Sequence, residues 1–249
     1  MKKRKERGIE WYEYDIFSTH KNLRHATFLR RGGTSSDEYT SLNTAYDVGD
    51  NSIYVTENLS RIKSLLNTTN LVWAKQVHAT KIIPITSPHE TIPECDAFMT
   101  STPGVALMIK HADCQAAIFY DPRNKAYAVV HAGWRGTVQN IYATTINAMV
   151  DSYDTDPEEL LVAISPSLGP DAACFENYRE ELPEVFWPYQ EKPLYFNFWE
   201  ISRMQLENAG IQPHNIEIAG VCTYGNEEDF FSYRRDKVTG RHATVAMLC

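Results

Sequence analysis

Four short apolar runs follow one another in the middle of the chain, and they restrict its fold more than any other feature. The runs cover residues 97–100, 105–109, 116–120 and 126–130. The turn-forming sequences Thr-Pro-Gly and Asp-Pro-Arg-Asn separate two of the neighbouring pairs. Short runs that are apolar throughout and bounded by turns are typical of buried strands. We therefore expect a buried sheet system in this part of the chain.

Helices are expected before and after these strands. Residues 52–66 carry isoleucine and leucine at near-helical spacing, with Asp50 or Ser52 available to cap the first turn. A second helix is expected over residues 136–149, directly after the last apolar run, and a third one ends at Gly210. Further strands are predicted at residues 71–78, 81–85, 160–164, 216–222 and 243–248.

Composition restricts the domain organisation and the class of partner. With 249 residues and 43% hydrophobic content, the chain can bury roughly 70–75% of its unfolded surface, which supports one large domain or two small ones. No linker, repeat or low-complexity tract divides it, so we expect one catalytic domain over residues 11–249. The formal net charge of −8 argues against nucleic acid, because binding a phosphate backbone needs a basic surface. A small molecule is the expected partner.

Residues 1–10 are expected to form a flexible basic N-terminus. Lysine and arginine dominate them, and the run continues into Glu10 and Trp11 and not into an apolar segment, so it is not a signal peptide. A solvated terminus is the simpler interpretation, and an arm that binds a polyanion is the alternative. No stretch of about 18 apolar residues is present, so no membrane span is expected.

The five cysteines favour a reducing compartment. An odd number of cysteines in a chain without an export signal is typical of free thiols, so we expect a cytoplasmic protein. No Cys-x-x-Cys pair occurs, which disfavours a closed zinc site made of four thiolates.

Two imidazoles and one thiol occur near the ends of predicted strands. His78 ends the segment Gln-Val-His, Cys114 ends Ala-Asp-Cys, and His131 begins His-Ala-Gly-Trp-Arg-Gly. They are too far apart in sequence to share one helix face, but strand ends can meet at the edge of a sheet. Three such donors with one open position make the catalytic form of a zinc site, in which the ion polarises the atom under attack. The alternative is a metal-free cysteine nucleophile with a histidine as its base.

Two arginines and an asparagine in predicted loops are candidates for binding an anion or a ribose. Arg135 precedes a predicted helix and Arg30 precedes a Gly-Gly loop, so each could hold phosphate; a packing or salt-bridged arginine is the alternative. Asn43 lies in a polar turn, where it could bind ribose or phosphate or close its own turn. Asp113 could orient a metal ligand or bind local amides, and His111 is expected beside the site at most.

Nine segments, taken in order, resemble the YfiH-like family, which is also labelled laccase-domain, polyphenol oxidoreductase or peptidoglycan-editing-factor-like. The resemblance runs from about residue 25 to residue 248, and the ordered set is specific although each segment is short. The segments are residues 30–33, 41–43, 48–50, 76–78, 96–100, 112–114, 131–136, 165–170 and 232–241.

The resemblance implies a fold, an activity and a set of site residues. The implied fold is a single α/β (α+β) domain of layered mixed β-sheets with flanking helices. The implied activity is that of a zinc-dependent purine nucleoside phosphorylase and adenosine deaminase, with phosphate and adenosine, inosine or 5′-methylthioadenosine as partners. The implied zinc ligands are His78, Cys114 and His131, and Arg30 would hold phosphate or ribose. We expect a monomer or a weak homo-oligomer.

Three positions depart from the family pattern. His111 stands in place of an expected threonine, Gln115 in place of an aliphatic residue, and Asp47 in place of a histidine. None of the three is an implied metal ligand. Because His111 and Gln115 flank the expected site, they are candidates for setting the substrate preference.

Three other functions remain open from the sequence. A copper-dependent polyphenol oxidase needs many imidazoles, and the eight histidines include no His-x-His pair. A Cys/His hydrolase acting on peptidoglycan precursors would use Cys114 as its nucleophile, although no glycine-rich elbow surrounds this residue. A non-catalytic binding protein is the third, and it would have no need for three converging metal donors.

Overall fold

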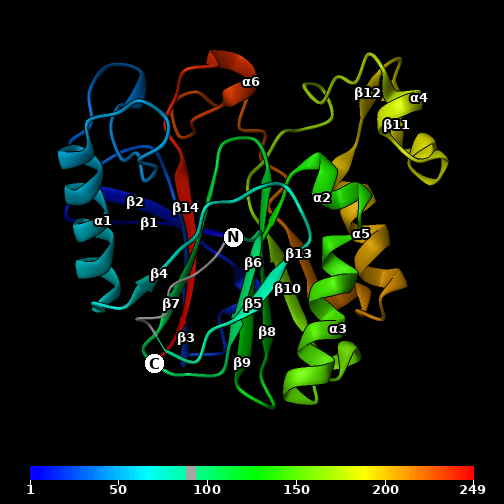
Figure 1. Cartoon of the computed structure of the whole chain (residues 1–249), viewed down its shortest axis with the longest axis horizontal. Helices are drawn as coiled ribbons and strands as arrows, with labels where there is room; N and C mark the ends of the chain where they lie inside the picture. The colour runs from blue at the N-terminus through cyan, green and yellow to red at the C-terminus, as the bar shows by residue number, and fades with distance from the viewer. Residues whose placement is uncertain (88–93) are drawn as a thin grey trace.

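The computed structural model describes residues 1–87 and 94–249, which form two six-stranded sheets packed face to face between helices (Figure 1). In spatial order, the strands of the first sheet are β1 (Lys2–Glu6), β2 (Ile9–Glu13), β3 (Leu23–Phe28), β14 (His242–Leu248), β7 (Ala106–His111) and β4 (Leu71–Val72). Those of the second sheet are β13 (Ile216–Ile218), β10 (Leu161–Ile164), β8 (Gln115–Asp121), β9 (Ala126–Ala132), β6 (Ala97–Thr100) and β5 (Ile82–Pro84). Each sheet contains parallel and antiparallel pairs, so the expected fold of layered mixed sheets is confirmed.

Three long helices cover the outer faces of the sheets. α1 (Ser52–Leu66) lies on the first sheet, whereas α3 (Ile141–Tyr153) and α5 (Phe198–Asn208) lie on the second (Figure 1). The shorter elements are α2 (Trp134–Val138), α4 (Tyr178–Glu181), α6 (Tyr233–Asp236), β11 (Gln190–Lys192) and β12 (Tyr195–Phe196). The 3-10 helices are η1 (Asp15–Phe17), η2 (Asp37–Tyr39), η3 (Pro157–Glu159), η4 (Glu184–Tyr189) and η5 (Pro213–Asn215). The helices α2, α4 and α6 lie toward one end of the sheets, at the top of Figure 1.

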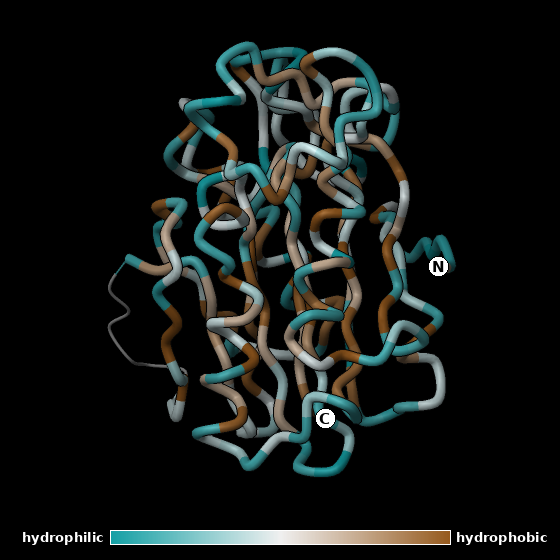
Figure 2. The backbone as a smooth tube through the Cα atoms, turned by 90° about the vertical axis from the view of Figure 1, so that its right-hand side faces the viewer, coloured by the Kyte–Doolittle hydropathy of each residue, from teal (hydrophilic) through white to brown (hydrophobic). Residues whose placement is uncertain are grey.

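The core is layered because successive residues of a strand point to opposite faces. On β7, Leu107 and Ile109 face the second sheet, whereas Ala106 and Met108 belong to the cluster beneath α1. A third cluster joins the outer face of the second sheet to α3 and α5. Figure 2 shows hydrophobic positions along the strands and helices of the body and mainly hydrophilic loops at its ends. This alternation explains why the strands are apolar on both faces.

The four apolar runs form β6, β7, β8 and β9, but they divide between the two sheets. β7 belongs to the first sheet, and β6, β8 and β9 are neighbours in the second. The chain crosses from one sheet to the other at residues 112–114, between β7 and β8. This crossing places Cys114 where the ends of both sheets meet.

Two predicted helix boundaries differ from those observed. Asn51 is the N-cap of α1, and its side chain accepts a hydrogen bond from the N–H of Ile53, so neither Asp50 nor Ser52 is the cap. The helix expected over residues 136–149 is two helices, α2 and α3. Asn140 separates them in the left-handed conformation, with φ of 56°, and caps α3 with its own side chain. Asparagine adopts this conformation more readily than most residues, which permits the break.

The N-terminal segment forms a strand, in contrast to the flexible arm expected for residues 1–10. β1 pairs with β2 in antiparallel register through a turn at Arg7 and Gly8, which both have positive φ. Lys3 contacts the carboxylates of Glu10 and Asp229, and Lys5 also contacts Glu10. The basic run therefore pairs with acidic residues of the protein itself.

The described helices include none that is long and apolar enough to cross a membrane. All five cysteines are free thiols.

A pair of buried histidines lies between the sheets. His111 and His242 are register partners on β7 and β14, and their rings meet edge to face with centroids 4.7 Å apart. The Nε2 atom of His111 shares a hydrogen bond with the hydroxyl of Thr244. The remaining three ring nitrogens have no partner within residues 1–87 and 94–249. Burial lowers the pKa of His111 to about 3 and holds the pKa of His242 well below its usual value. Both rings are therefore neutral in the folded protein.

This pair predicts a loss of stability in acid. The unfolded histidines take up protons below about pH 6.5 while the folded ones stay neutral, so each should lower the free energy of unfolding by about 1.4 kcal/mol per pH unit. Stability contributed by the pair is present above pH 6.5 and is lost as the pH falls toward about 3. We expect the His242→Phe variant to show a shallower decline between pH 6 and pH 4, measured by urea denaturation. The exposed His214, changed to phenylalanine, is the control; an unaltered slope in His242→Phe would contradict the argument.

Candidate metal centre

His78, Cys114 and His131 converge at the end of the sheets. His78 lies in the connection between β4 and β5, Cys114 lies at the crossing before β8, and His131 lies on β9. Their ligand atoms all lie within 4.8 Å of one another. The Sγ atom of Cys114 is 3.9 Å from Nε2 of His78, and the two imidazole rings are nearly perpendicular. The structure thus brings together the three donors that the sequence suggests for a metal, which we call the His-Cys-His cluster.

Asp96 holds two residues of this cluster in place through hydrogen bonds. Its carboxylate is fully buried, and Oδ1 accepts a hydrogen bond of 2.8 Å from Nδ1 of His131. The same carboxylate accepts the backbone N–H groups of Val77, His78 and Ala79. Because Nδ1 of His131 is engaged by Asp96, Nε2 is the nitrogen left for the cluster, and the loop that carries His78 is fixed in place.

Electrostatics keep the thiol ionised. Burial alone would raise the pKa of Cys114, but the charge of His131 and hydrogen bonds from His131 and His78 lower it to about 6. Burial alone would lower the pKa of His131, but the thiolate and Asp96 raise it to about 9. Burial likewise opposes ionisation of Asp96, yet its hydrogen bond from His131 and those from the amides lower its pKa. Without a metal, Cys114 and His131 form a thiolate–imidazolium pair at neutral pH.

The cluster fits a zinc ion by its chemistry and its space. A thiolate and two imidazoles are donors that zinc accepts, and a carboxylate behind a ligating histidine is its usual support. Gly133 leaves room for the ligands, since a Cβ atom there would lie 2.5 Å from Cδ2 of His78 and 3.2 Å from Sγ of Cys114. His78 has φ of 60° and Asp113 has φ of 84°, an uncommon conformation that is often found at functional sites.

Asp113 connects the crossing between β7 and β8 to α6 by a hydrogen bond. Its carboxylate accepts hydrogen bonds from the hydroxyl of Thr223 and the backbone N–H of Arg234. Of the two roles considered for Asp113, the structure therefore supports the binding of nearby polar groups. Its effect on Cys114 is through the conformation of the turn.

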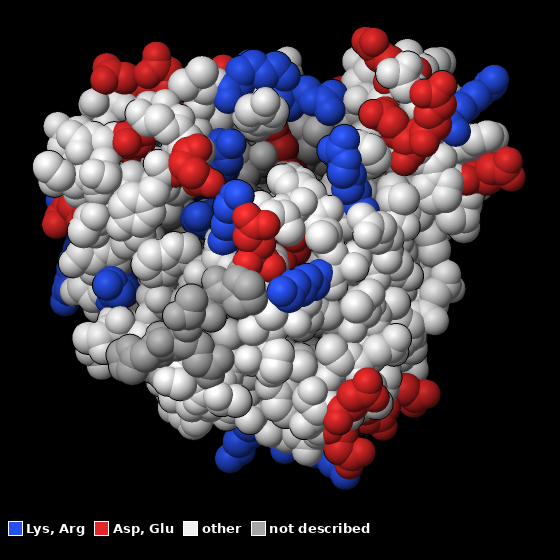
Figure 3. Space-filling model, in the orientation of Figure 1, with Lys and Arg blue, Asp and Glu red and all other residues white. Residues whose placement is uncertain are grey.

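Two cavities border the cluster. The aromatic cavity, of about 500 Å³, is walled by the rings of Trp134, Phe175 and Phe198. The basic cavity, of about 420 Å³, contains the side chains of Lys110 and Arg241. The residues shared by both walls are His78, Ala112, Cys114 and Tyr233. Figure 3 shows the surface hollowed in this region, near α2 and α6, with basic side chains around the hollow.

Arg135 and Gln115 both border the aromatic cavity. The exposed guanidinium of Arg135 stacks on the ring of Trp134 at 4.2 Å and lies within reach of a bound molecule. Gln115 is buried, and its amide is bound by Tyr142, Ser202 and the carbonyl of Phe198. Gln115 therefore shapes the wall, but its polar atoms are already occupied. His111 borders the basic cavity and bonds to Thr244.

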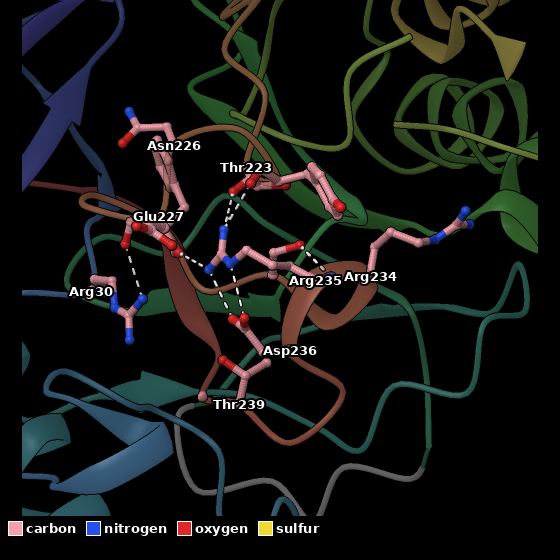
Figure 4. Close-up of polar contacts among 12 residues, drawn as sticks. Arg30, Thr223, Asn226, Glu227, Arg234, Arg235, Asp236 and Thr239 are labelled. Carbon is pink, nitrogen blue, oxygen red and sulfur yellow. Dashed lines mark hydrogen bonds and ion pairs between the residues drawn. The ribbon is translucent and has the colours of Figure 1, made fainter. Parts of the chain in front are cut away.

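Arg30 lies apart from the cluster, although the sequence suggests that it holds phosphate or ribose beside the reacting groups. Its guanidinium donates hydrogen bonds to the carbonyls of Thr40 and Glu227 and lies 4.7 Å from the ring centre of Phe231. It borders an open depression that contains none of the three metal donors. Figure 4 shows Arg30 directed to Glu227, with Arg235 bonded to Thr223 and Asp236 nearby. The arginines of this depression mainly hold loops together.

Asn43 makes its hydrogen bonds within the protein. It is fully buried, and its amide group donates to the carbonyl of Ala45 and to Asp50. Its Oδ1 atom accepts the backbone N–H groups of Ala45 and Arg241. All of its hydrogen-bonding capacity is therefore used within the protein.

The sequence reasoning missed Asp96, Lys110, Arg241 and the aromatic wall. Asp96 could have been found as an acid placed directly before an apolar strand, where a buried carboxylate needs a partner. Lys110 could have been found as a charge at the end of a strand that is otherwise apolar. The signal for Phe175 and Phe198 was absent, because their approach to the cluster depends on how a distant segment folds back.

Known proteins resemble this chain over most of its length. Residues 24–249 match the family model described as multi-copper polyphenol oxidoreductase laccase. A protein of Shigella flexneri named purine nucleoside phosphorylase YfiH is 32% identical over 237 residues, which cover 92% of this chain and 95% of that protein. A purine nucleoside phosphorylase of Bacteroides thetaiotaomicron is 30% identical over 244 residues, covering 89% and 90% of the two chains.

The solved structures show the same fold. The crystal structure of YlmD from Geobacillus stearothermophilus superposes with a TM-score of 0.88 at 28% identity, covering 98% of this chain and 97% of that one. The family suggested by the ordered sequence segments is thus confirmed. The chain belongs to the YfiH-like family of laccase-domain proteins.

Proposed function

We propose that this protein is a zinc-dependent purine nucleoside phosphorylase that also deaminates adenosine. The relatives named purine nucleoside phosphorylase support an enzyme of this kind. The observation that carries the proposal is the aromatic cavity, which opens directly onto the His-Cys-His cluster. A purine needs flat apolar walls, and the reacting sugar carbon must lie beside the polarising group.

The residues divide into three roles. His78, Cys114 and His131 would hold the zinc ion, which when bound supplies a Lewis acid that polarises the reacting molecule. The rings of Phe175 and Phe198 stack on one another, with centroids 5.2 Å apart, and give the purine an apolar wall. Trp134 continues this wall, and the exposed Arg135 stacked on its face can contact the base or its substituents. Arg30 and Asn43 have no part in this proposal.

Two reactions follow from one bound nucleoside. In phosphorolysis, a phosphate oxygen attacks the anomeric carbon while the bond to the purine nitrogen breaks, which gives ribose 1-phosphate and the free base. In deamination, water replaces the amino group of adenosine and gives inosine and ammonia. We propose adenosine, inosine and 5′-methylthioadenosine as substrates, and the cytoplasm as the compartment that keeps the five thiols reduced.

The Cys114–His131 pair favours a second candidate, a metal-free Cys/His hydrolase acting on peptidoglycan precursors. A thiol with a pKa of about 6 beside an imidazolium is an activated nucleophile. The two candidates differ in their dependence on zinc, since the hydrolase needs Cys114 free. Elemental analysis separates both from a copper oxidase, for which copper would be the metal present.

The experiment that tests the proposal is an assay of zinc-loaded protein with adenosine, with and without phosphate. Adenine and ribose 1-phosphate should appear when phosphate is present, and inosine should appear in both reactions, as measured by liquid chromatography. Restoration of activity by zinc after treatment with a chelator is the expected control result. Product formation from adenosine that is unaffected by removal of zinc would contradict the proposed dependence on zinc.

A further inference from the structure

The basic cavity is not used by the nucleoside in the function proposed above. It lies on the first-sheet side of the His-Cys-His cluster and is bordered by Asp47, Gln76, Lys110, Tyr233 and Arg241. Its volume of about 420 Å³ exceeds the space that a small inorganic anion needs. Its two cations come from the ends of adjacent strands, because Lys110 lies near the end of β7 and Arg241 directly precedes β14.

Lys110 is a half-buried cation without a fixed partner. Its backbone is held by the side chain of Gln76, which accepts the N–H of Lys110 and donates to its carbonyl. Its ammonium group makes no hydrogen bond or ion pair with the residues of segments 1–87 and 94–249. Burial lowers the pKa of Lys110, and the charge of Asp47 opposes this only in part. Keeping such a charge away from bulk water costs free energy, which a bound anion would offset.

Arg241 presents a second cation to the same cavity. Its backbone N–H is bound by Oδ1 of Asn43, and one terminal nitrogen donates to the carbonyls of Thr239 and Gly240. The guanidinium carbon lies 5.6 Å from the ring centre of Tyr233. Nε and the other terminal nitrogen have no hydrogen-bond partner among the described residues, so this edge of the guanidinium remains available. Asn43, which does not face the cavity, thereby positions Arg241.

We propose that Lys110 and Arg241 bind the inorganic phosphate that attacks the nucleoside. This inference rests on the proposed phosphorylase function. The two cavities meet at His78, Ala112 and Cys114, so a purine in the aromatic cavity leaves the anomeric carbon at this junction. Phosphate in the basic cavity would then lie beside the same junction, close enough to reach this carbon.

The bond changes balance without a further reactant. An oxygen of phosphate forms the new bond to the anomeric carbon, and the electron pair of the broken carbon–nitrogen bond stays on the purine. The purine takes up the proton that hydrogen phosphate loses, and phosphate becomes the ester group of ribose 1-phosphate. Lys110 and Arg241 hold the phosphate oxygens that do not react, which fixes the direction of attack.

The test compares the full-length, zinc-loaded protein with its Lys110→Met and Arg241→Gln variants. Binding of inorganic phosphate is measured by isothermal titration calorimetry at constant ionic strength, and the KM for phosphate is measured with inosine. Each substitution should weaken phosphate binding and raise this KM by about tenfold or more, since each removes a charged hydrogen bond. The KM for inosine should change much less. Lys110→Arg should recover most of the phosphate affinity, which separates the loss of charge from a folding defect.

The control is Lys125→Met, which removes an exposed lysine from the turn between β8 and β9 and should leave phosphate binding unchanged. If phosphorolysis occurs but the KM for phosphate is the same in both variants, the phosphate site is overturned and the function stands. If the variants lose phosphate binding but no phosphorolysis is found in the parent protein, the anion site stands and the function fails. Loss of nucleoside 5′-monophosphate binding without loss of free phosphate binding would overturn the assignment in favour of a phosphate ester.

Discussion

The Cys114→Ala variant is expected to lose zinc and nucleoside turnover together. Cys114 supplies the only sulfur of the cluster. Because its pKa is about 6, the thiol is already ionised at neutral pH and can bind zinc directly. With two imidazoles remaining, the affinity for zinc should fall by more than about a hundredfold, because the loss of supporting residues alone costs about 10- to 100-fold. Zinc content after dialysis and the rate of inosine phosphorolysis measure the two effects.

Cys174→Ala is the matched control, since Cys174 is also a half-buried free thiol and does not belong to the cluster. It should retain zinc and activity. The metal-free parent protein adds a second readout, because Cys114 should react with iodoacetamide at pH 7 and zinc should protect it. Phosphorolysis that persists in Cys114→Ala would contradict the role of this residue.

The sequence predicts the strands well because their side chains point into a core that tolerates only apolar residues. The runs that become β6, β7, β8 and β9 are recognisable for this reason. Their division between two sheets cannot be recognised from the sequence, since it depends on the crossing at residues 112–114, where Asp113 takes a left-handed conformation. The N-terminal strand was missed because charged residues at a sheet edge resemble a solvated tail. Only its pairing with acidic residues of β2, seen in space, shows the difference.

The same limit explains which site residues could be predicted. His78, Cys114 and His131 have side chains whose chemistry is specific, so their types alone suggest a metal centre. Arginine and asparagine are ambiguous, because they bind backbone carbonyls as readily as ligands. Arg30 and Asn43 both proved to be used in this way, whereas Arg241, in the same part of the fold, keeps one edge of its guanidinium free.

Asp96→Asn should weaken zinc binding without touching a zinc ligand. The carboxylate accepts four hydrogen bonds, two on each oxygen, from His131 and from the backbone of residues 77–79. An amide has the same shape, but its NH₂ group is a donor and would face backbone N–H groups that are also donors. Two of the four hydrogen bonds should therefore be lost, either both from Val77 and Ala79 or those from His78 and His131, so the support of at least one zinc ligand is weakened.

We expect the zinc affinity of Asp96→Asn to fall by about 10- to 100-fold, as measured by competition with a chelator, and stability to fall by about 3 kcal/mol. Asp121→Asn is the matched control, because Asp121 is also buried and accepts three hydrogen bonds, from Arg123 and Asn124, at the far end of β8. Its substitution should cost about 1 kcal/mol of stability and leave zinc affinity unchanged. Equal zinc affinities in Asp96→Asn and the parent protein would show that the ligands hold their positions unaided. A loss confined to Asp96→Asn would show instead that one buried carboxylate orients both histidines of the centre.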